Sequence, residues 1–220
     1  MQGLQGAHRA LRRFEEFGRK ASQNNTKTVW VLKCDVRKFF ASIDQNVLIR
    51  VLGIHIKDKK VLQLMYEVIS SFRSTQVGKG LPLGNLTSQL FVNIYMDWFD
   101  QYMKHRIKTR YYIRYVDDFV IMNTEKTILE NILTDIQIFL KDTLFLDLHP
   151  NKVFIKTLAS GVDFLGWVHF PYHRVLRTVT KKRMFKNLRS KKDSKATLQS
   201  YLGMLSHGNA KKLAQKITTL

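Results

Sequence analysis

The chain has 220 residues, enough for one domain or two small ones, and 45% of them are hydrophobic, as in an ordinary globular protein with a core. Its single cysteine, Cys34, excludes a disulfide framework and a zinc site built from cysteines. Its 37 lysines and arginines against 17 acids give a formal net charge of +20, which favours a polyanionic partner such as nucleic acid, with an anionic membrane surface as the alternative. No apolar run approaches the roughly 20 residues that span a bilayer, so we expect no membrane partner. The N-terminus lacks the apolar core of a signal peptide, and the single cysteine fits a reducing cytoplasm, where we expect the protein.

The first third of the chain alternates helical and strand patterns. Apolar residues at helical spacing predict a short basic helix over 7–20, followed by a polar loop over 22–28. Residues 29–32 form an apolar, β-branched run typical of a buried strand, which leads to Lys33-Cys34-Asp35. Asp44 is expected to cap a helix over 45–52, and a second amphipathic helix is expected over 61–72.

The middle of the chain predicts a hairpin between helices. A loop with glycine and proline covers 76–84, and a helix follows over about 85–104. Residues 111–122 read as a hairpin with its turn at 116–118, followed by a helix over 127–140. Strands are expected over 144–148 and 153–155, with β character from 164 to about 170. This order indicates an α+β fold in which helices cover one face of a mainly antiparallel sheet.

The composition changes after Pro171. Residues 171–220 contain 13 lysines and arginines but one acid, Asp193, so they carry +12 of the chain's net charge. Two segments, 198–205 and 210–220, read as helices separated by Ser206-His207-Gly208-Asn209. We therefore expect a small, basic, helical C-terminal domain.

Two adjacent carboxylates, Asp117 and Asp118, interrupt the apolar run of the hairpin. Burying such charges without partners is costly, so the pair forms either a polar surface turn or a binding site for a divalent cation. Because successive strand residues point to opposite faces, both carboxylates reach one ion only if the chain bends here. Asp35 ends the strand formed by 29–32, and if this strand neighbours the hairpin, the three carboxylates meet. An oxygen-only cluster suits Mg²⁺, and two such ions support phosphoryl or nucleotidyl transfer.

Five motifs follow one another along the chain: DVRKFF at 35–40, GLPLGNLTSQ at 80–89, YVDD at 115–118, HPNK at 149–152 and FLGW at 164–167. In order and spacing they resemble the polymerase motifs of reverse transcriptases, from about Gly3 to the C-terminus. The resemblance implies an RNA-directed DNA polymerase with a right-hand palm whose sheet and helices form a ferredoxin- or RRM-like core. It also implies a remnant of the fingers at 1–28, the palm at 29–171 and a basic helical thumb at 172–220.

The match is closest to bacterial reverse transcriptases of diversity-generating retroelements and their relatives, with group II intron enzymes further off. Most reverse transcriptases carry Gln-Gly in the second motif and end it in Ser-Pro, whereas this chain has Leu83-Gly84 and Ser88-Gln89. Leu83 cannot hydrogen-bond an incoming nucleotide as a glutamine would, so loosened nucleotide selection is expected. The alternative is that Leu83 only packs and that the exchange marks lineage.

The resemblance implies a role for each matching residue. Asp35, Asp117 and Asp118 match the metal-binding carboxylates, and the backbone oxygen of Val36 is expected to join them in holding two Mg²⁺ ions, for which Mn²⁺ could substitute. Gly84 would let the backbone approach the nucleotide. The residues expected to contact dNTP, primer or template are Val36, Arg37, Phe40, Leu83, Gly84, Gln89, Tyr115, Val116, Phe164, Leu165, Gly166 and Trp167.

Three of these roles have a structural alternative. Phe40 matches the residue that would clash with a ribose 2′-OH and so select dNTPs, or it packs in the core. Lys152 matches a lysine that could protonate pyrophosphate, or it is a solvated loop charge. The segment 164–167 resembles the primer grip, or its aromatic residues belong to the core.

Reverse transcriptases normally carry a fingers segment before the point where Met1 begins, and Gly3–His8 resembles the tail of that segment. We therefore expect this chain to lack the basic fingers residues that hold nucleotide phosphates. Three functions stay open: a polymerase of the diversity-generating type, a truncated nucleic-acid-binding palm–thumb module without catalysis, and a polymerase of a phage-defence or group II intron system. The expected partners are an RNA template, a DNA or RNA primer and dNTPs, with a small basic accessory protein as a further candidate.

Overall fold

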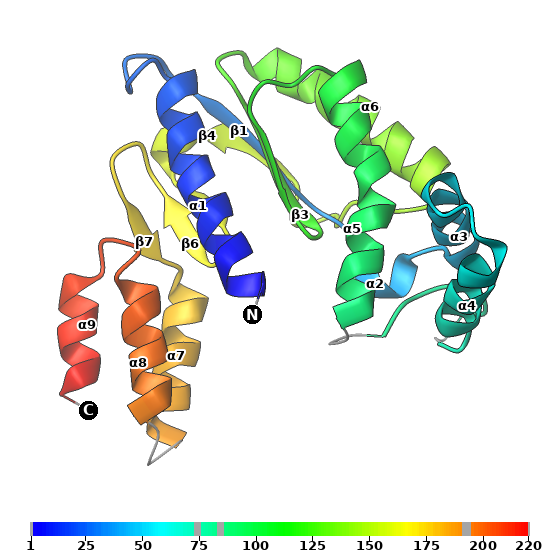
Figure 1. The fold of residues 1–220 in the computed structure, drawn as a ribbon. Helices are drawn as coiled ribbons and strands as arrows, with labels where there is room; N and C mark the ends of the chain where they lie inside the picture. The colour runs from blue at the N-terminus through cyan, green and yellow to red at the C-terminus, as the bar shows by residue number, and fades with distance from the viewer. Residues whose placement is uncertain (1, 73–75, 83–85, 191–194, 220) are drawn as a thin grey trace. The chain divides into compact units, whose positions relative to one another are not determined.

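The computed structural model describes residues 2–72, 76–82, 86–190 and 195–219 (Figure 1). The chain divides into two compact units. The central unit comprises Val31–Ile155, and the terminal unit combines Met1–Trp30 with Lys156–Leu220. The predicted boundaries of fingers, palm and thumb, at residues 28 and 171, stay predictions. The two compact units are defined by contacts within the chain, and such contacts do not identify fingers, palm or thumb.

A four-stranded sheet with the order β2-β3-β1-β4 organises the central unit. β2 and β3 form the predicted antiparallel hairpin, in which Tyr112 lies opposite Ile121 and Tyr115 opposite Asp118. The inner residues of β1 and β3 are buried, as their apolar and β-branched composition predicts. The strands are β1 (Trp30–Asp35), β2 (Tyr112–Tyr115), β3 (Asp118–Asn123) and β4 (Phe154–Thr157).

Five α-helices and one π-helical turn complete the central unit among the residues described. Asp44 caps α3 as predicted, since its carboxylate accepts hydrogen bonds from the backbone N–H groups of Asn46 and Val47, and Asp58 caps α4 in the same way. α5 and α6 lie side by side, and α6 packs on β3 (Figure 1). The elements are α2 (Phe39–Ser42), α3 (Gln45–His55), α4 (Lys59–Ser70), α5 (Leu86–Gln101), η1 (Tyr102–Arg106) and α6 (Lys126–Leu144).

Tyr95 on α5 joins three segments of the core. Its hydroxyl donates to the carbonyl of Leu144 at 2.5 Å and accepts from the backbone N–H of Asp44 at 3.4 Å. One turn further along α5, the fully buried Phe99 packs on Phe119 of β3, with their ring centroids 5.0 Å apart. The end of α6, the start of α3 and the hairpin are therefore fixed to one helix.

The strand expected over 144–148 is wrong. α6 extends to Leu144, and Phe145 takes a left-handed conformation with a φ of 51° that ends the helix. The apolar pattern over 144–148 was ambiguous because Leu144 and Leu146 are buried whichever element holds them. Only an isolated antiparallel bridge, between Val36 and Leu148, gives the segment β character.

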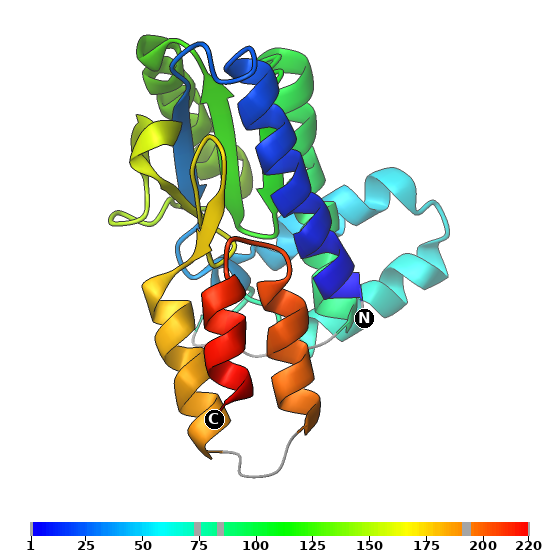
Figure 2. The ribbon, with the colours of Figure 1, turned by 90° about the vertical axis from the view of Figure 1, so that its left-hand side faces the viewer.

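The terminal unit packs a three-stranded sheet with helices from both ends of the chain. The sheet has the antiparallel order β5-β6-β7, and α7, α8 and α9 stand next to one another below it in Figure 2. α8 and α9 correspond to the two helices predicted at 198–205 and 210–220, whereas the helix α7 and the strand β7 were not predicted. The elements are α1 (Gln2–Ala21), η2 (Leu158–Ser160), β5 (Val162–Phe164), β6 (Trp167–His169), β7 (Arg174–Leu176), α7 (Thr178–Ser190), α8 (Lys195–Leu205) and α9 (Lys211–Thr218).

The core of the terminal unit is aromatic. Phe14 of α1 is buried against Phe164 and His169, with ring centroids 5.5 and 4.2 Å apart. The Arg174 guanidinium lies over the Trp167 ring at 5.6 Å and forms an ion pair with Glu15 at 2.8 Å. α1 thus belongs to the same packed body as the β5-β6-β7 sheet.

The expected α+β class is confirmed, since antiparallel strands and helices build both units. Among the residues described, no helix combines the length and apolarity that a membrane span requires.

Candidate active site

The turn between β2 and β3 holds a strained backbone. Val116 has a φ of 59°, which a β-branched residue rarely adopts. The Arg114 guanidinium donates to the carbonyl of Val116 at 3.0 Å and binds Asp100 of α5 through two parallel hydrogen bonds of 2.8 and 2.6 Å. A bidentate arginine–carboxylate pair is strong and directional. It therefore anchors the turn that carries Asp117 and Asp118 to α5.

Asp35 lies next to this turn, as expected from the sequence. β1 is the sheet neighbour of β3, and the backbone N–H of Val36 donates to the carbonyl of Asp117 at 3.2 Å. The carbonyl of Asp35 accepts from the backbone N–H of His149 at 2.7 Å, which brings the HPNK segment to the same end of the sheet. Three of the five motifs thus converge at one site.

Two lysines balance the carboxylates. Lys33, two residues before Asp35 on β1, is buried, and its Nζ lies 3.1 Å from Oδ1 of Asp118. Lys152 is half exposed, and its Nζ donates to both carboxylate oxygens of Asp35 at 3.0 and 3.2 Å. The acidic site is therefore a mixed network of three carboxylates and two ammonium groups.

Burial and mutual repulsion perturb the carboxylates. Burial raises the pKa of Asp118 to about 7; Lys33 opposes this rise, and the charges of Asp35 and Asp117 add to it. Burial also raises the pKa of Asp117, and the charge of Asp35 contributes in the same direction. Carboxylates whose pKa is raised by burial and by neighbouring negative charge are common in functional sites.

The donor set fits a hard divalent cation in its chemistry. All the candidate donors are oxygens, which Mg²⁺ prefers. Oδ1 of Asp118 is buried, and the ammonium group of Lys33 lies 3.1 Å from it. Within the described part of the chain, however, no three histidine, cysteine or acidic side chains are already gathered as a metal-binding set. A cation bound here would have to compete with the two lysines.

The residues predicted to contact nucleotide differ in their exposure. Phe40 on α2 is half-buried beside Phe39, with ring centroids 5.6 Å apart, so both its predicted role and its packing alternative stay open. Arg37 and Gln89 are exposed, whereas the Val36 side chain is buried and Tyr115 is half-buried. Leu83 and Gly84 lie outside the described residues.

Gln89 shares a face of α5 with a residue that reaches the hairpin. Asn93, one turn later, donates to the carbonyl of Gln89 at 2.9 Å, and Arg114 donates to Asn93 at 3.5 Å. The predicted contact of Gln89 with substrate stays a prediction.

The FLGW segment forms a tight hairpin turn in the terminal unit. Leu165 and Gly166, with φ of 50° and 84°, connect β5 to β6, as a two-residue turn of this kind requires. Phe164 and Trp167 are buried in the core, in line with the structural alternative for the aromatic residues, and Leu165 and Gly166 are partly exposed. The predicted contact with primer stays a prediction and rests on those two exposed positions.

Two parts of the site were not anticipated from the sequence. Lys33 could have been recognised, because it shares a strand face with Asp35 and is a charge within a buried run. The pairing of Arg114 with Asp100 could not, since it joins a strand to a helix 14 residues earlier in the chain. Both act by positioning or balancing the predicted carboxylates.

The antiparallel hairpin, whose turn carries Asp117 and Asp118 next to the strand that ends at Asp35, is consistent with the palm-like fold of a nucleic-acid polymerase. The chain belongs to the reverse transcriptase (RNA-dependent DNA polymerase) family, whose sequence profile matches residues 2–169.

The sequence relatives include intron-encoded proteins. The chain is 25% identical over 217 aligned positions to the COX1/OXI3 intron 2 protein of Saccharomyces cerevisiae, a match covering 66% of this chain and 25% of that protein. It is 26% identical to the protein YkfC of Escherichia coli, covering 69% of this chain and 48% of YkfC. A match of 29% identity to the group II intron-encoded protein LtrA of Lactococcus lactis covers 34% of this chain and 13% of LtrA. The chain thus spans at most about half the length of these relatives.

The structural neighbours include yeast telomerases. Apo telomerase from Candida tropicalis superposes with a TM-score of 0.61 at 16% identity, covering 89% of this chain and 40% of the telomerase. Telomerase from Candida albicans, solved in complex with a TWJ fragment of telomeric RNA, superposes with a TM-score of 0.57 at 13% identity, covering 81% of this chain and 38% of that one. At this level of identity the likeness concerns the fold.

Proposed function

We propose that the chain is the palm-containing part of an RNA-directed DNA polymerase that adds dNTPs to a primer. The observation that carries the proposal is the convergence of Asp35 with the Asp117–Asp118 turn, across the hydrogen bond from the N–H of Val36 to the carbonyl of Asp117. Family membership supports the same activity. The strained φ of Val116 supports it as well, because backbone strain of this kind concentrates at functional sites.

The carboxylates Asp35, Asp117 and Asp118, with the backbone oxygen of Val36, would hold Mg²⁺, with Mn²⁺ as a substitute. When bound, a pair of such ions activates the 3′-oxygen of a primer and stabilises the leaving pyrophosphate. Partial burial of Asp117 and Asp118 strengthens their attraction for a cation, because the surroundings are less polar than water. Lys152, half exposed and paired with Asp35, would give its proton to the departing pyrophosphate.

Lys33 would supply the positive charge of the site when no metal cation is bound. Its ammonium group offsets the carboxylates when no cation is present, which keeps the acidic turn from destabilising the fold. On cation binding, the same ammonium group would limit the total negative charge that the site can offer.

The nucleic-acid partners are proposed from charge. The net charge of +20 suits a phosphate backbone, and the exposed Lys181, Lys182, Arg183 and Lys186 of α7 belong to the segment that resembles the thumb. Contacts to phosphate position a duplex without reading its sequence. An RNA template, a DNA or RNA primer and dNTPs are therefore the proposed substrates.

A binding module without catalysis is the second candidate. It is favoured by the ion pairs that occupy Asp35 and Asp118 and by the absence of a preformed metal set among the described residues. Such a module would bind RNA or DNA in a salt-sensitive way and extend no primer in any divalent metal.

Primer extension on an RNA template separates the two candidates. The chain should add dNTPs in Mg²⁺, and Asp117→Asn should abolish the addition. Asp142→Asn, which removes an exposed carboxylate at the end of α6, is the matched control and should extend normally. Running the assay also with a chain extended upstream of Met1 tests whether fingers residues are needed. Full extension by Asp117→Asn would contradict the proposed role of the turn.

The type of retroelement is proposed more narrowly from Leu83 and from Ser88-Gln89. A diversity-generating enzyme should misincorporate preferentially opposite template adenine, and Leu83→Gln should reduce those errors. Uniform fidelity over the four template bases would instead favour an intron-type enzyme, which the LtrA relative also favours.

A further inference from the structure

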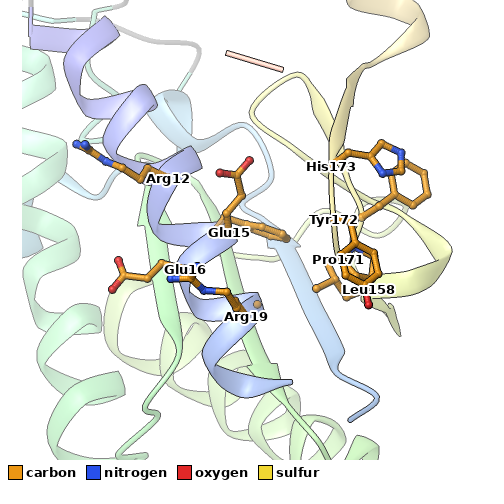
Figure 3. Close-up of a pocket in the computed structure, with 11 residues that line it drawn as sticks. Arg12, Glu15, Glu16, Arg19, Leu158, Pro171, Tyr172 and His173 are labelled. Carbon is orange, nitrogen blue, oxygen red and sulfur yellow. The ribbon is translucent and has the colours of Figure 1, made fainter. Parts of the chain in front are cut away.

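Two adjoining hollows lie in the surface of the terminal unit, and Tyr172 lines both. The larger, of about 470 Å³, lies between α1 and the 170–173 turn that joins β6 to β7 (Figure 3). The smaller, of about 200 Å³, is lined by the loop that follows α1 and by the same turn. Leu158 and Pro171 also line both hollows. The Tyr172 side chain is 81% exposed at their common border, so it offers an aromatic surface to whatever occupies either one.

The 170–173 turn has a fixed shape. The backbone N–H of Phe170 donates to the carbonyl of His173 at 2.8 Å, and the two rings stack with centroids 4.9 Å apart. Asn25 donates from its side-chain amide to a backbone carbonyl of the turn at 3.3 Å. Gly161 leaves space for this arrangement, because a Cβ there would lie 2.8 Å from the Phe170 ring. Tyr172 therefore stands on a preorganised support, which lowers the entropy lost on binding.

The charges around the larger hollow favour an anion. Both acids on its lining, Glu15 and Glu16, are neutralised within the unit by ion pairs of 2.8 and 2.7 Å. Arg12 and Arg19 line the same hollow from α1, and both are exposed. Among the described residues, neither arginine forms an ion pair, and Lys27 adds another exposed cation at the smaller hollow. With the two acids paired, the remaining charged side chains of the two linings are the cations Arg12, Arg19 and Lys27.

We propose that these two hollows form a binding site for single-stranded nucleic acid, separate from the carboxylate site of the central unit. One unpaired base stacks on Tyr172, and the phosphates on either side of it bind Arg12 or Arg19 and Lys27. An aromatic platform next to a cationic track is how proteins hold single strands without reading sequence, because every base has a π-face. The volume of the larger hollow is in the range of nucleotide-sized ligand sites. This site would retain a single-stranded part of the template or product and goes beyond the proposed polymerase activity.

Fluorescence anisotropy with labelled oligo(rU) and oligo(dT) tests the site in the full chain. The measurement is made in EDTA and without dNTPs, so it does not depend on polymerisation. Tyr172→Ala should weaken binding by roughly five- to 150-fold, the range that loss of one stacked base produces. Tyr172→Trp should restore it, since indole stacks at least as well. Arg12→Gln and Arg19→Gln should each reduce the slope of log affinity against log salt by about 0.7 wherever that arginine binds a phosphate.

Matched controls remove general effects of charge and aromatic content. Tyr66→Ala removes a tyrosine of α4 that is 48% exposed, and Lys141→Gln removes an exposed charge from α6; neither should affect Tyr172-dependent binding. If Tyr172→Ala lowers the affinity for oligo(rU) alone, the site binds RNA; if it lowers the affinity for oligo(dT) alone, the site binds DNA. If it lowers both affinities, the site accepts both kinds of single strand. A Tyr172→Ala chain that melts normally and binds both probes as tightly as the unmodified chain would overturn the proposal.

Discussion

Replacing Lys33 by methionine should destabilise the protein strongly, and divalent cations should reverse part of the loss. Lys33 is 7% exposed, and its Nζ is 3.1 Å from Oδ1 of Asp118, in a site that also contains Asp35 and Asp117. Methionine retains the length and most of the volume of the lysine stem but removes the charge. Three carboxylates would then share the one remaining cation of the network, Lys152.

The magnitude follows from burial. Each pKa unit corresponds to about 1.4 kcal/mol, so a rise from 3.8 to about 7 means that ionised Asp118 costs the folded state on the order of 4 kcal/mol even with Lys33 present. Removing one partner of a buried ion pair typically costs about 3–5 kcal/mol, and the full cost applies only at a pH well above the pKa of Asp118, where its carboxylate is ionised. For a chain of this size the loss corresponds to a fall in melting temperature of roughly 6–20 °C.

The pH dependence has a definite sign. Because the pKa of Asp118 is raised, the folded chain binds a proton that the unfolded chain has released between about pH 4 and pH 7. The contribution of Asp118 therefore lowers stability as pH rises through this window. In Lys33→Met the window should extend to higher pH, because the charge that opposes the rise is gone.

The assay is thermal unfolding of Lys33→Met across pH, with and without Mg²⁺. Mg²⁺ should raise the melting temperature of Lys33→Met more than that of the unmodified protein, since the ion replaces the missing charge. Adding Asp118→Asn should recover most of the lost stability, and Lys141→Met on the exposed face of α6 is the matched control. The reasoning would be refuted if Lys33→Met unfolded within about 0.5 kcal/mol of the unmodified protein, as an ordinary surface substitution does.

Three further predictions concern other parts of the structure. Tyr95→Phe should lower the free energy of unfolding by about 1–3 kcal/mol in urea titrations, because the buried carbonyl of Leu144 loses its donor. His169→Leu should remove a loss of stability below about pH 6.5: burial lowers the pKa of His169 to about 3, so only the unfolded chain gains the proton in that range, at about 1.4 kcal/mol per pH unit. Arg114→Lys should reduce primer extension and destabilise the chain by about 1.5–3 kcal/mol, the contribution of a hydrogen bond to a charged group, since an ammonium group cannot bind Asp100 in a bidentate manner and hold the turn as well.

Each of these has a contrary outcome. Unchanged unfolding of Tyr95→Phe would mean that Leu144 finds another donor. An acid-induced loss of stability that persists in His169→Leu would assign the effect to a different group. Normal extension by Arg114→Lys would show that the turn keeps its shape without the bidentate pair.

The composition and motif order of the sequence determined the class of the protein. The alternation of helical and strand patterns predicted the α+β fold, and Asp44 was identified as a helix cap from residue type and position alone, because capping depends on local hydrogen bonds. The two carboxylates in an apolar run predicted a turn at 116–118, because both cannot be buried in a regular strand. In the structure the turn consists of Val116 and Asp117, one residue shorter than predicted, because Asp118 is the first residue of β3.

Local patterns failed where burial did not distinguish the possible elements. The segment 144–148 has the apolar residues of a strand, yet α6 packs on β3 and continues to Leu144. The hydroxyl of Tyr95 donates a hydrogen bond to the carbonyl of Leu144. β7 and α7 were not predicted because their residues are basic and weakly periodic. β7 is tied to α1, far away in the sequence, by the ion pair of Arg174 with Glu15.

The sequence by itself identified Asp35, Asp117 and Asp118 as the candidate residues, because carboxylates next to apolar strands are costly unless they face solvent, form ion pairs or bind a cation. Only the tertiary structure showed how the charges of these carboxylates are balanced. It supplies Lys33 and Lys152 as counter-charges and uses the Arg114–Asp100 pair to hold Val116 in its strained conformation. The physical reason is that charge balance and backbone strain depend on groups brought together across the sheet, and no local pattern records that proximity.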